Sequence, residues 1–482
     1  MAKVLWNPSE DRKNSSLIQQ FIDKSSLNFE TYFDLHKWSI NKIEDFWSEF
    51  WDFSRIIYSK KYDKVLSNSV MPGAKWFEDS ELNYAENLLS GNPEQVAIIS
   101  IDENRKDQTF TFRELNEAVA SVQKGLEKLG VKKGTRIAAF VPNCVETVIL
   151  MLAATSSGAI WTSCSPDFGS QGVIDRFGQI EPSILIVANG YTYNGKIFAL
   201  EDKINGVLET INSIEKVISI NFVDIACSLN HNSVVNYDTL FFEEAKIPNF
   251  VQLPFDHPLY IMYSSGTTGP PKSIIHGAGG TLIQHLKEHQ LQCDIQEGRD
   301  TLFWFTTCGW MMWNWLISAL ASGATIVLYD GSPSHPDLGA LWRIVEKTRI
   351  THFGTSPKFL AACTNSGLEP KKEADLSSVK ALLSTGAPLV PEQFDWVYEN
   401  IGSDIHLASI SGGTDILGCF LGGSPILPVH RGEIQCPQLG MNVQSWNTAG
   451  KSIIGESGEL VCVRPFPSMP IGFWNDSDGL KY

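Results

Sequence analysis

The sequence predicts an α/β protein with two parallel-sheet α/β subdomains in a layered arrangement, followed by a small β-barrel subdomain. Apolar strand-like runs alternate with helix-like segments from about residue 91 onward, and the alternation starts again at Thr301–Phe305. From about Asp415 only short strands and turns remain. Strands that alternate with helices form parallel sheets covered on both faces, so each block predicts one such sheet.

Four regions follow from these patterns. Residues 1–90 are rich in aromatic side chains and helix-like, which predicts a leading helical layer. Residues 91–254 are expected to form the first sheet subdomain and 255–414 the second. Residues 415–482 are expected to form the β-barrel part.

The elements of the two blocks have local signals. Thr111–Glu114 has the form of a capping box, and apolar residues at three-four spacing continue the helix to Leu129. The expected strands are 136–141 and 159–161 in the first block, and 301–305, 325–329, 350–353 and 379–383 in the second. Helices are expected through Leu152 and through Leu320.

Composition limits the function. The net charge is −16 and no long basic stretch occurs, which argues against nucleic acid as the main ligand. The nine cysteines stand singly, without a C-x-x-C pair, which fits a reduced cytosolic compartment better than a zinc site or disulfide framework. The N-terminal residues do not resemble a signal peptide. The longest apolar run, Val148–Ala154, is too short for a membrane span.

The segment Tyr263–Lys272 predicts a phosphate-binding loop between two strands. It contains four serine and threonine hydroxyls (Ser264, Ser265, Thr267, Thr268), two glycines (Gly266, Gly269) and Lys272. Glycines let backbone amides approach an anion, hydroxyls rotate to donate, and lysine adds a positive charge. The loop is not a Walker A sequence, because two prolines separate Gly269 from Lys272. A Ser/Thr/Gly-rich surface turn is the alternative.

Three more segments follow expected strands, where open α/β folds bind ligands. The Gly386–Pro388 turn can lie against a purine, or be a plain turn before a helix. Ser409–Asp415 offers hydroxyls, glycines and a carboxylate that suits Mg²⁺, or an Asx-type turn. Gly309–Trp315 is dense in tryptophan and methionine, which is typical of a helix core, yet its position puts Trp310 at a pocket mouth.

With these segments in order, the chain resembles the adenylate-forming superfamily of acyl-CoA synthetases, luciferases and peptide-synthetase adenylation domains. Tyr263–Lys272 is similar to its phosphate loop, Gly386–Pro388 to its adenine-contacting turn, and Thr414-Asp415 to its Thr-Glu pair, with aspartate in place of glutamate. Gly458–Leu460 is similar to its Gly-Glu-Leu strand. Trp76-Phe77 and Leu82–Asn87 resemble the acetyl-CoA synthetase branch.

Within that branch the likeness is greatest to members that activate acetoacetate. It rests on the segments 4–9, 71–77, 411–416, 431–436 and 465–476 and runs almost end to end. It implies that a carboxylate attacks ATP to give an acyl-adenylate and pyrophosphate, and that coenzyme A then displaces AMP. Another short acid, such as acetate, propionate or butyrate, is the nearest alternative. A non-catalytic nucleotide-binding module is the second.

The resemblance also implies roles for single residues. The β- and γ-phosphates of ATP are expected at Ser264–Thr268 and Lys272, with Gly269 in the loop. Mg²⁺ is expected at Asp415, and the α-phosphate at Thr414. The residues expected to be catalytic are Lys272, Thr414 and Asp415. The nucleotide is expected at Gly386, Ala387, Pro388, Ser409 and Gly413, the acyl group at Trp310, Met311 and Gly412, and the nucleotide end of coenzyme A at Asn194 and Lys196.

Two departures from the family pattern stand out. Gly412 occupies the place of a tryptophan that closes the acyl pocket of acetate-activating members, and its small size is expected to make room for acetoacetate. The family's ribose-binding aspartate, hinge and C-terminal lid domain with its adenylation lysine are expected to lie outside these 482 residues. Weak nucleotide binding and poor turnover are therefore expected of this polypeptide. Its substrates are small molecules, and its oligomeric state stays open.

Overall fold

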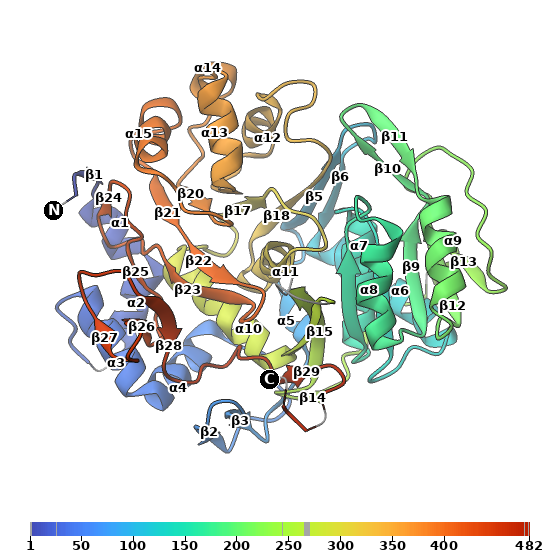
Figure 1. Cartoon of the computed structure of the whole chain (residues 1–482), viewed down its shortest axis with the longest axis horizontal. Helices are drawn as coiled ribbons and strands as arrows, with labels where there is room; N and C mark the ends of the chain where they lie inside the picture. Colours follow the sequence, from blue (N-terminus) through green and yellow to red (C-terminus); the bar gives the residue numbers. More distant parts are fainter. Residues whose placement is uncertain (1, 26, 243, 265–269, 477, 481) are drawn as a thin grey trace.

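Two large sheets form the centre of the molecule (Figure 1). The structure is a computed structural model that describes residues 2–25, 27–242, 244–264, 270–476, 478–480 and 482. The first sheet has the order β13-β12-β9-β7-β8-β15-β16-β29, and the second has the order β21-β20-β19-β17-β18-β5-β6. Nearly all neighbours are parallel. The exceptions are β16 and β29 at one edge of the first sheet and β6 at one edge of the second.

The strand bounds follow the predicted apolar runs closely. The first sheet contains β7 (Arg136–Phe140), β8 (Ile160–Cys164), β9 (Ile184–Ala188), β12 (Lys216–Ile220), β13 (Val234–Asn236), β15 (Pro258–Ser264), β16 (Lys272–Gly277) and β29 (Gly472–Phe473). The second contains β5 (Val96–Asp102), β6 (Gln108–Thr111), β17 (Thr301–Trp304), β18 (Thr325–Asp330), β19 (His352–Thr355), β20 (Ala381–Ser384) and β21 (His406–Ser409).

Helices cover these sheets, and the capping signals place several of them correctly. The capping box at Thr111 and Glu114 forms and opens α6 (Phe112–Lys128). Helix α7 (Val145–Ser156) is buried along its whole length. The other helices of this part are α5 (Tyr84–Leu88), α8 (Ser170–Ile180), α9 (Glu201–Thr210), α10 (Ala278–Lys287), α11 (Met311–Ser318), α12 (Ala340–Thr348), α13 (Pro357–Asn365), α14 (Pro370–Glu373) and α15 (Pro391–Asn400).

The expected N-terminal helical layer is present. It consists of α1 (Glu10–Ser15), α2 (Leu17–Lys24), α3 (Tyr32–Asn41) and α4 (Ile43–Ser54), drawn in blue in Figure 1. Phe46, Trp47 and Phe50 of α4 are fully buried, and α4 packs against α10 of the central part. This layer thus shares one apolar core with the sheets. Short strands and α5 complete the region to residue 90, so it is not helical throughout.

The division of the sheets at residue 254 is wrong. Strands β5 and β6, from the first predicted block, pair with β18 of the second sheet. Strands β15 and β16, from the second block, pair with β8 of the first sheet. Local periodicity identifies a strand but not its partner, because pairing depends on long-range burial of the two sheet faces. The chain therefore crosses between the sheets.

The C-terminal part is not a single β-barrel among the described residues. One three-stranded sheet is β22 (Ser411–Gly413), β23 (Gly418–Gly422) and β25 (Cys436–Pro437). Another is β27 (Ser452–Ile453), β26 (Val443–Trp446) and β28 (Glu459–Cys462), while β29 joins the first large sheet. These strands have only two to five residues, and their backbone hydrogen bonds fall in separate small sheets.

One buried side chain links the two large sheets at the carboxyl ends of their strands. Asn143 follows β7, and its backbone N–H donates to Oδ1 of Asp330 at the end of β18 (3.0 Å). Its side-chain amide donates to the carbonyl oxygen of Tyr329 (3.3 Å) and accepts from Nε1 of Trp313 on α11 (2.9 Å). The two sheets and α11 therefore meet at one satisfied polar group.

No helix among the described residues is long and apolar enough to cross a bilayer. The nine cysteines, all within the described part of the chain, are free thiols.

The structure predicts acid sensitivity from His406 on β21. Burial lowers the pKa of His406 from 6.5 to about 3, although Gln435 accepts from its ring 2.7 Å away. Below pH 6.5 the unfolded chain binds a proton that the folded chain does not, so stability falls as pH falls, by about 1.4 kcal/mol per unit. Between pH 7 and pH 5, the free energy of unfolding of His406→Gln should therefore fall by about 2 kcal/mol less than that of the parent, as measured by urea unfolding. Equal losses in both proteins would exclude this role.

Candidate functional site

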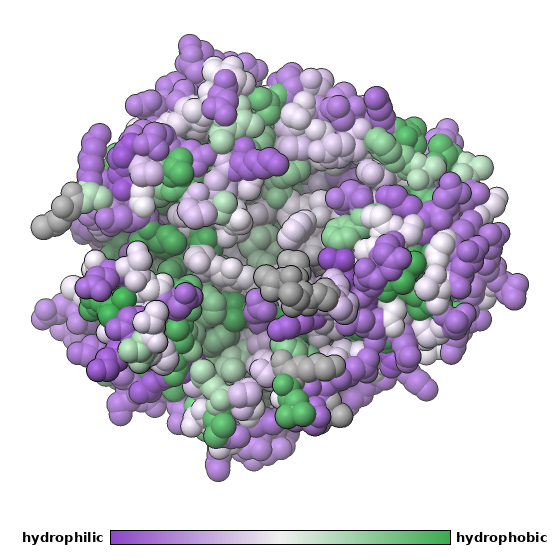
Figure 2. All heavy atoms as spheres, viewed as in Figure 1, coloured by the Kyte–Doolittle hydropathy of each residue, from purple (hydrophilic) through white to green (hydrophobic). Residues whose placement is uncertain are grey.

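A cavity of about 500 Å³ opens at the carboxyl ends of the second sheet. Its walls come from the segments after β17, β19, β20 and β21, from the first turn of α11, and from β23. Figure 2 shows that this face of the molecule is hollowed near its centre, with purple hydrophilic side chains mainly around the periphery. Six of the predicted site residues line the cavity: Trp310, Met311, Gly386, Gly412, Gly413 and Thr414.

The predicted phosphate loop is described only at its ends. Ser264 and Lys272 are register partners at the end of the β15–β16 hairpin that is next to the predicted phosphate loop, and Lys272 is exposed. The Lys272 ammonium lies 5.5 Å from the ring centroid of Phe473. Ser265, Gly266, Thr267, Thr268 and Gly269 lie outside the described residues. Neither Ser264 nor Lys272 lines the cavity itself.

Strand β16 connects this hairpin to the cavity. His276 lies four residues beyond Lys272 on the strand, about 13 Å further along at the usual rise. Burial lowers the pKa of His276 to about 3, and the neighbouring Thr414 backbone opposes that shift. Because His276 is next to Thr414, the strand that starts at Lys272 ends beside the cavity wall.

The Ser409–Asp415 segment gives the cavity one wall and leaves its carboxylate free. Ser409 is buried at the end of β21, in register with Ser384 of β20, which is in register with Thr355 of β19. Asp415 is exposed and forms no ion pair with any described residue. Within the described parts of the chain, no group of three or more His, Cys, Asp or Glu residues could hold a metal ion.

The Gly386–Pro388 turn is exposed at the cavity rim. Gly386 has φ of +93°, a conformation that favours glycine, and a Cβ built there would meet no atom within 4 Å. Gly386 lines the cavity, whereas Ala387 and Pro388 lie just outside its lining. Thr385 fixes the turn, because its hydroxyl donates to the carbonyl oxygen of Ile410 (2.8 Å).

The structure gives Gly412 a role other than the expected one. A Cβ at Gly412 would lie 2.1 Å from the carbonyl oxygen of Gly418 on β23. A larger side chain would meet this strand before it reached the cavity. The close approach of two backbones thus accounts for glycine at 412, and extra room for the acid does not follow from this position alone.

The expected coenzyme A residues lie apart from the cavity, on the hairpin of β10 (Gly190–Tyr193) and β11 (Lys196–Ala199). The backbone amides of Asn194 and Gly195 donate to the two carboxylate oxygens of Glu103, at 2.9 and 2.6 Å. These amides are therefore occupied by a carboxylate of the same chain. Lys196 remains exposed at the turn.

Several cavity residues were not among the single residues predicted for the site, although Met312, Thr385 and Ile410 stand beside predicted ones. These cavity residues are Trp304, Phe305, Thr306, Thr307, Met312, Thr355, Ser356, Thr385, Ile410, Gly418 and Cys419. Most of these residues lie at the ends of the strands expected at 301–305, 350–353 and 379–383, or directly after them. The same carboxyl-end argument that selected Gly386 would have found them.

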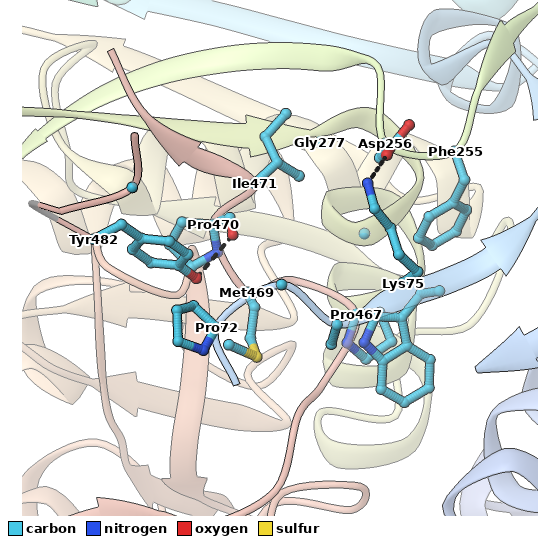
Figure 3. A pocket seen from close by; sticks show the side chains of 15 residues that line it. Pro72, Lys75, Phe255, Asp256, Gly277, Pro467, Met469, Pro470, Ile471 and Tyr482 are labelled. Atoms are coloured by element: carbon cyan, nitrogen blue, oxygen red, sulfur yellow. Dashed lines mark hydrogen bonds and ion pairs between the residues drawn. The ribbon is translucent and has the colours of Figure 1, made fainter. Parts of the chain in front are cut away.

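A second cavity of about 200 Å³, shown in Figure 3, gathers none of the predicted site residues. Prolines and apolar side chains line much of it, including Pro467 and Met469. Two of its polar side chains are paired within the chain: Lys75 pairs with Asp256 (2.8 Å), and Tyr482 donates to the carbonyl oxygen of Pro470 (2.8 Å). The 500 Å³ cavity is the candidate site because it brings six of the predicted site residues together.

The two adjacent glycines at the cavity provide a matched test of its backbone. A Cβ at Gly413 would meet no atom within 4 Å, in contrast to Gly412. Gly412→Ala should lower the free energy of unfolding by about 1–3 kcal/mol, because β23 must shift. Gly413→Ala should change it by less than about 0.5 kcal/mol. Chemical denaturation of both variants checks this, and similar stabilities would contradict the close approach of β22 and β23.

Comparisons with known proteins agree with this geometry. Residues 86–469 match the family AMP-binding enzyme, and residues 32–88 match the acetyl-coenzyme A synthetase N-terminus. The chain is 46% identical to acetoacetyl-coenzyme A synthetase of Rhizobium meliloti and 44% identical to acetoacetyl-CoA synthetase of Xenopus tropicalis. In both cases 100% of this chain aligns with 74% of the relative.

Two further similarities extend the comparison. Malonamoyl-CoA synthetase of Penicillium aethiopicum is 41% identical over 95% of this chain and 68% of its own length. The solved acetoacetyl-CoA synthetase from Streptomyces lividans superposes with a TM-score of 0.95 at 40% identity, covering 100% of this chain and 75% of that one. The chain therefore belongs to the AMP-binding enzyme family, in the acyl-CoA synthetase branch that carries the acetyl-coenzyme A synthetase N-terminal segment.

Proposed function

We propose that this protein ligates acetoacetate to coenzyme A with ATP, through an acetoacetyl-adenylate and with release of AMP and pyrophosphate. The observation that carries the proposal is the cavity beside Thr414, whose lining fits a short acid that has a second carbonyl group. The relatives support it, since several are named acetoacetyl-CoA synthetases and cover the whole chain.

The lining combines apolar walls with buried hydroxyls. Met311, Met312 and Cys419 provide apolar surface. The Thr307 and Thr355 side chains also line the cavity, and their hydroxyl oxygens are buried without a hydrogen-bond partner among the described residues. Buried hydroxyls normally have partners, so a ligand with a polar group beyond its carboxylate suits this cavity. Acetoacetate has such a group at C3, and butyrate does not.

The adenylation step requires two anions to meet. The acid carboxylate attacks the α-phosphorus, the bond to the β-phosphate oxygen breaks, and pyrophosphate leaves. We assign Thr414 to the α-phosphate because it lies between the cavity and β16. Ser264, Lys272 and the loop between them would hold the β- and γ-phosphates. Fixed donors at these points orient the phosphates and reduce charge repulsion in the transition state.

The residues present fit a magnesium ion held mainly by phosphate and water. Asp415 is exposed and unpaired with any described cation, and Mg²⁺ commonly takes one or two protein carboxylates beside substrate phosphates. When bound, the ion would neutralise part of the phosphate charge. Asp415 would be its protein ligand. Gly386, Ala387, Pro388, Ser409 and Gly413 would hold the nucleoside.

The second step is attack of the coenzyme A thiol on the adenylate carbonyl, with AMP as leaving group. We assign Lys196, with Asn194 beside it, to the nucleotide end of coenzyme A. The ammonium of Lys196 is the part of this turn that is free to meet a phosphate, because Glu103 already occupies the Asn194 and Gly195 amides.

Malonamate is the second candidate acid. It also has a carbonyl group at C3, and the Penicillium relative is named for it. The same buried hydroxyls would serve its amide oxygen.

A panel of acids tests the proposed substrate. In pyrophosphate exchange with ATP, acetoacetate should have the lowest KM, and butyrate, which leaves the Thr307 and Thr355 hydroxyls unpaired, should be at least about tenfold weaker in kcat/KM. Acetate and propionate should be weaker as well. A malonamate rate above that of acetoacetate would favour the second acid. Equal use of butyrate and acetoacetate would refute recognition of a C3 carbonyl.

The role of Asp415 is tested separately. Asp415→Ala should reduce exchange by roughly 10²-fold or more, the scale for loss of one charge-stabilising group. Exposed Asp45 on α4 offers a matched control, and Asp45→Ala should retain the parent rate. Raising the Mg²⁺ concentration should recover part of the Asp415→Ala loss. Near-parental exchange in Asp415→Ala at low Mg²⁺ would rule out the metal role.

A further inference from the structure

Glu288 is a buried carboxylate behind the acid cavity. It lies on a single π-helical turn, η2 (Glu288–Gln292), which continues α10 and contacts β23. Its side chain is 2% exposed. Such widened turns are rare and often occur at functional sites. The turn brings Glu288 within hydrogen-bond distance of β23, which forms one of the cavity walls.

The Glu288 carboxylate accepts hydrogen bonds from both of those walls. Its Oε1 accepts from the backbone N–H of Cys419 on β23 (2.8 Å) and from Nε2 of Gln284 (2.7 Å). Its Oε2 accepts from Nε1 of Trp315 on α11 (2.9 Å). Because Cys419 lines the cavity and α11 begins with two methionines that line it, one carboxylate links the two walls.

Two neighbouring features strengthen this link: Gly418 lets β23 approach Glu288 closely, and His285 forms a second connection, from the turn before β23 to α11. A Cβ at Gly418 would lie 2.9 Å from Oε1 of Glu288, so glycine permits the approach of β23. One turn earlier on α10, His285 lies 2.7 Å from the carbonyl oxygen of Leu417 and 2.7 Å from the Ser318 hydroxyl. His285 therefore joins the turn before β23 to the end of α11, parallel to the link through Glu288.

The charge of Glu288 is buried with one counter-charge. The Lys287 ammonium lies 3.7 Å from Oε1, and both side chains are buried. A buried ion pair is weak evidence for stability, because an apolar replacement is often as stable. What an apolar pair would not provide is a pair of directional hydrogen bonds to two separate elements, β23 and α11.

We propose that Glu288 is a positioning residue that fixes the spacing between β23 and α11, and thereby sets which acids the cavity accepts. This inference rests on the proposed assignment of the cavity to the acid. Glu288 approaches the cavity lining at Gly418 and at the backbone of Cys419, both on β23, and it is not itself a lining residue. Its effect should therefore appear in acid recognition and not in ATP binding.

The Glu288→Gln variant tests the link with little change in shape. Glutamine has one acceptor oxygen and one NH₂ group, whereas Cys419 N–H and Trp315 Nε1 both donate from fixed positions. Whichever way the amide turns, one of these donors faces another donor. Gln284 can adapt by turning its own amide, since its oxygen has no partner among the described residues. One wall must then move.

The measurement is calorimetric titration of the full chain with ATP and with acetyl- and acetoacetyl-sulfamoyl adenosine, stable mimics of two adenylates. The parent should bind the acetoacetyl mimic more tightly. Glu288→Gln should weaken the binding of the acetoacetyl mimic by about tenfold, the scale for one disrupted charge-assisted hydrogen bond. It should weaken the binding of ATP by less than about twofold. The ratio of the two mimics should therefore fall.

Asp300→Asn provides a matched control. Asp300 is a buried carboxylate paired with Lys380 (2.7 Å), directly before β17 at the opposite end of the second sheet. Its loss should lower the melting temperature and leave the ratio of the mimics unchanged. A fall in the ratio in Asp300→Asn equal to that in Glu288→Gln would overturn the inference, because general destabilisation would explain both.

The remaining outcomes separate the two hypotheses. The proposed function would be refuted if the parent chain bound ATP, but bound neither mimic more tightly than it bound AMP. A parent that prefers the acetoacetyl mimic, with the ratio unchanged in folded Glu288→Gln, would refute the positioning role alone. If Glu288→Gln does not fold, Trp315→Phe removes the same link from the other side and should lower the ratio about threefold. An unchanged ratio in Trp315→Phe would then overturn the inference.

Discussion

The Asn143 side chain is the contact on which the geometry of the site depends. It lies where the carboxyl ends of β7 and β18 meet, and it also accepts from Trp313 of α11. Each of these bonds contributes only about 1 kcal/mol net, but an orphaned buried donor or acceptor costs about 1–3 kcal/mol. The sheets and α11 are therefore held in one relative arrangement, since any other would leave several buried polar groups without partners.

That arrangement determines how an acidic chain can bind anions. With a net charge of −16, the molecule repels ATP and a carboxylic acid at long range. At the carboxyl ends of the strands, backbone amides and hydroxyls supply local positive potential without ionised side chains. Of the residues assigned to the acid and the triphosphate, only Lys272 is cationic. Such donors are fixed by the sheets and need little reorganisation when charge develops.

The strands, the capping box of α6 and the polar segments at strand ends followed from the sequence because each is a local pattern. Pairing between strands did not, since β5 and β15 each join the sheet of the other block. Gly412 shows the same limit within the site. Its small size suggested room for the acid, but the constraint on it is Gly418, which approaches only in the folded backbone. Glu288 left no sequence signal, because a carboxylate that follows a helical run looks the same in the sequence whether the fold buries it or leaves it in water.

The buried charges behind the cavity follow from the same geometry. The part of the cavity assigned to the acid lies between helix α11 and the short strand β23, which come from different parts of the chain. Apolar packing alone would let these two elements slide past each other. Selection between acids that differ by one or two atoms needs walls fixed to a fraction of an ångström. Glu288 and His285 fix them by directional bonds to both elements, from a helix that is itself packed against α4 of the N-terminal layer. The aromatic layer of the first ninety residues therefore supports the acid cavity through α10, although none of its described residues lines the cavity.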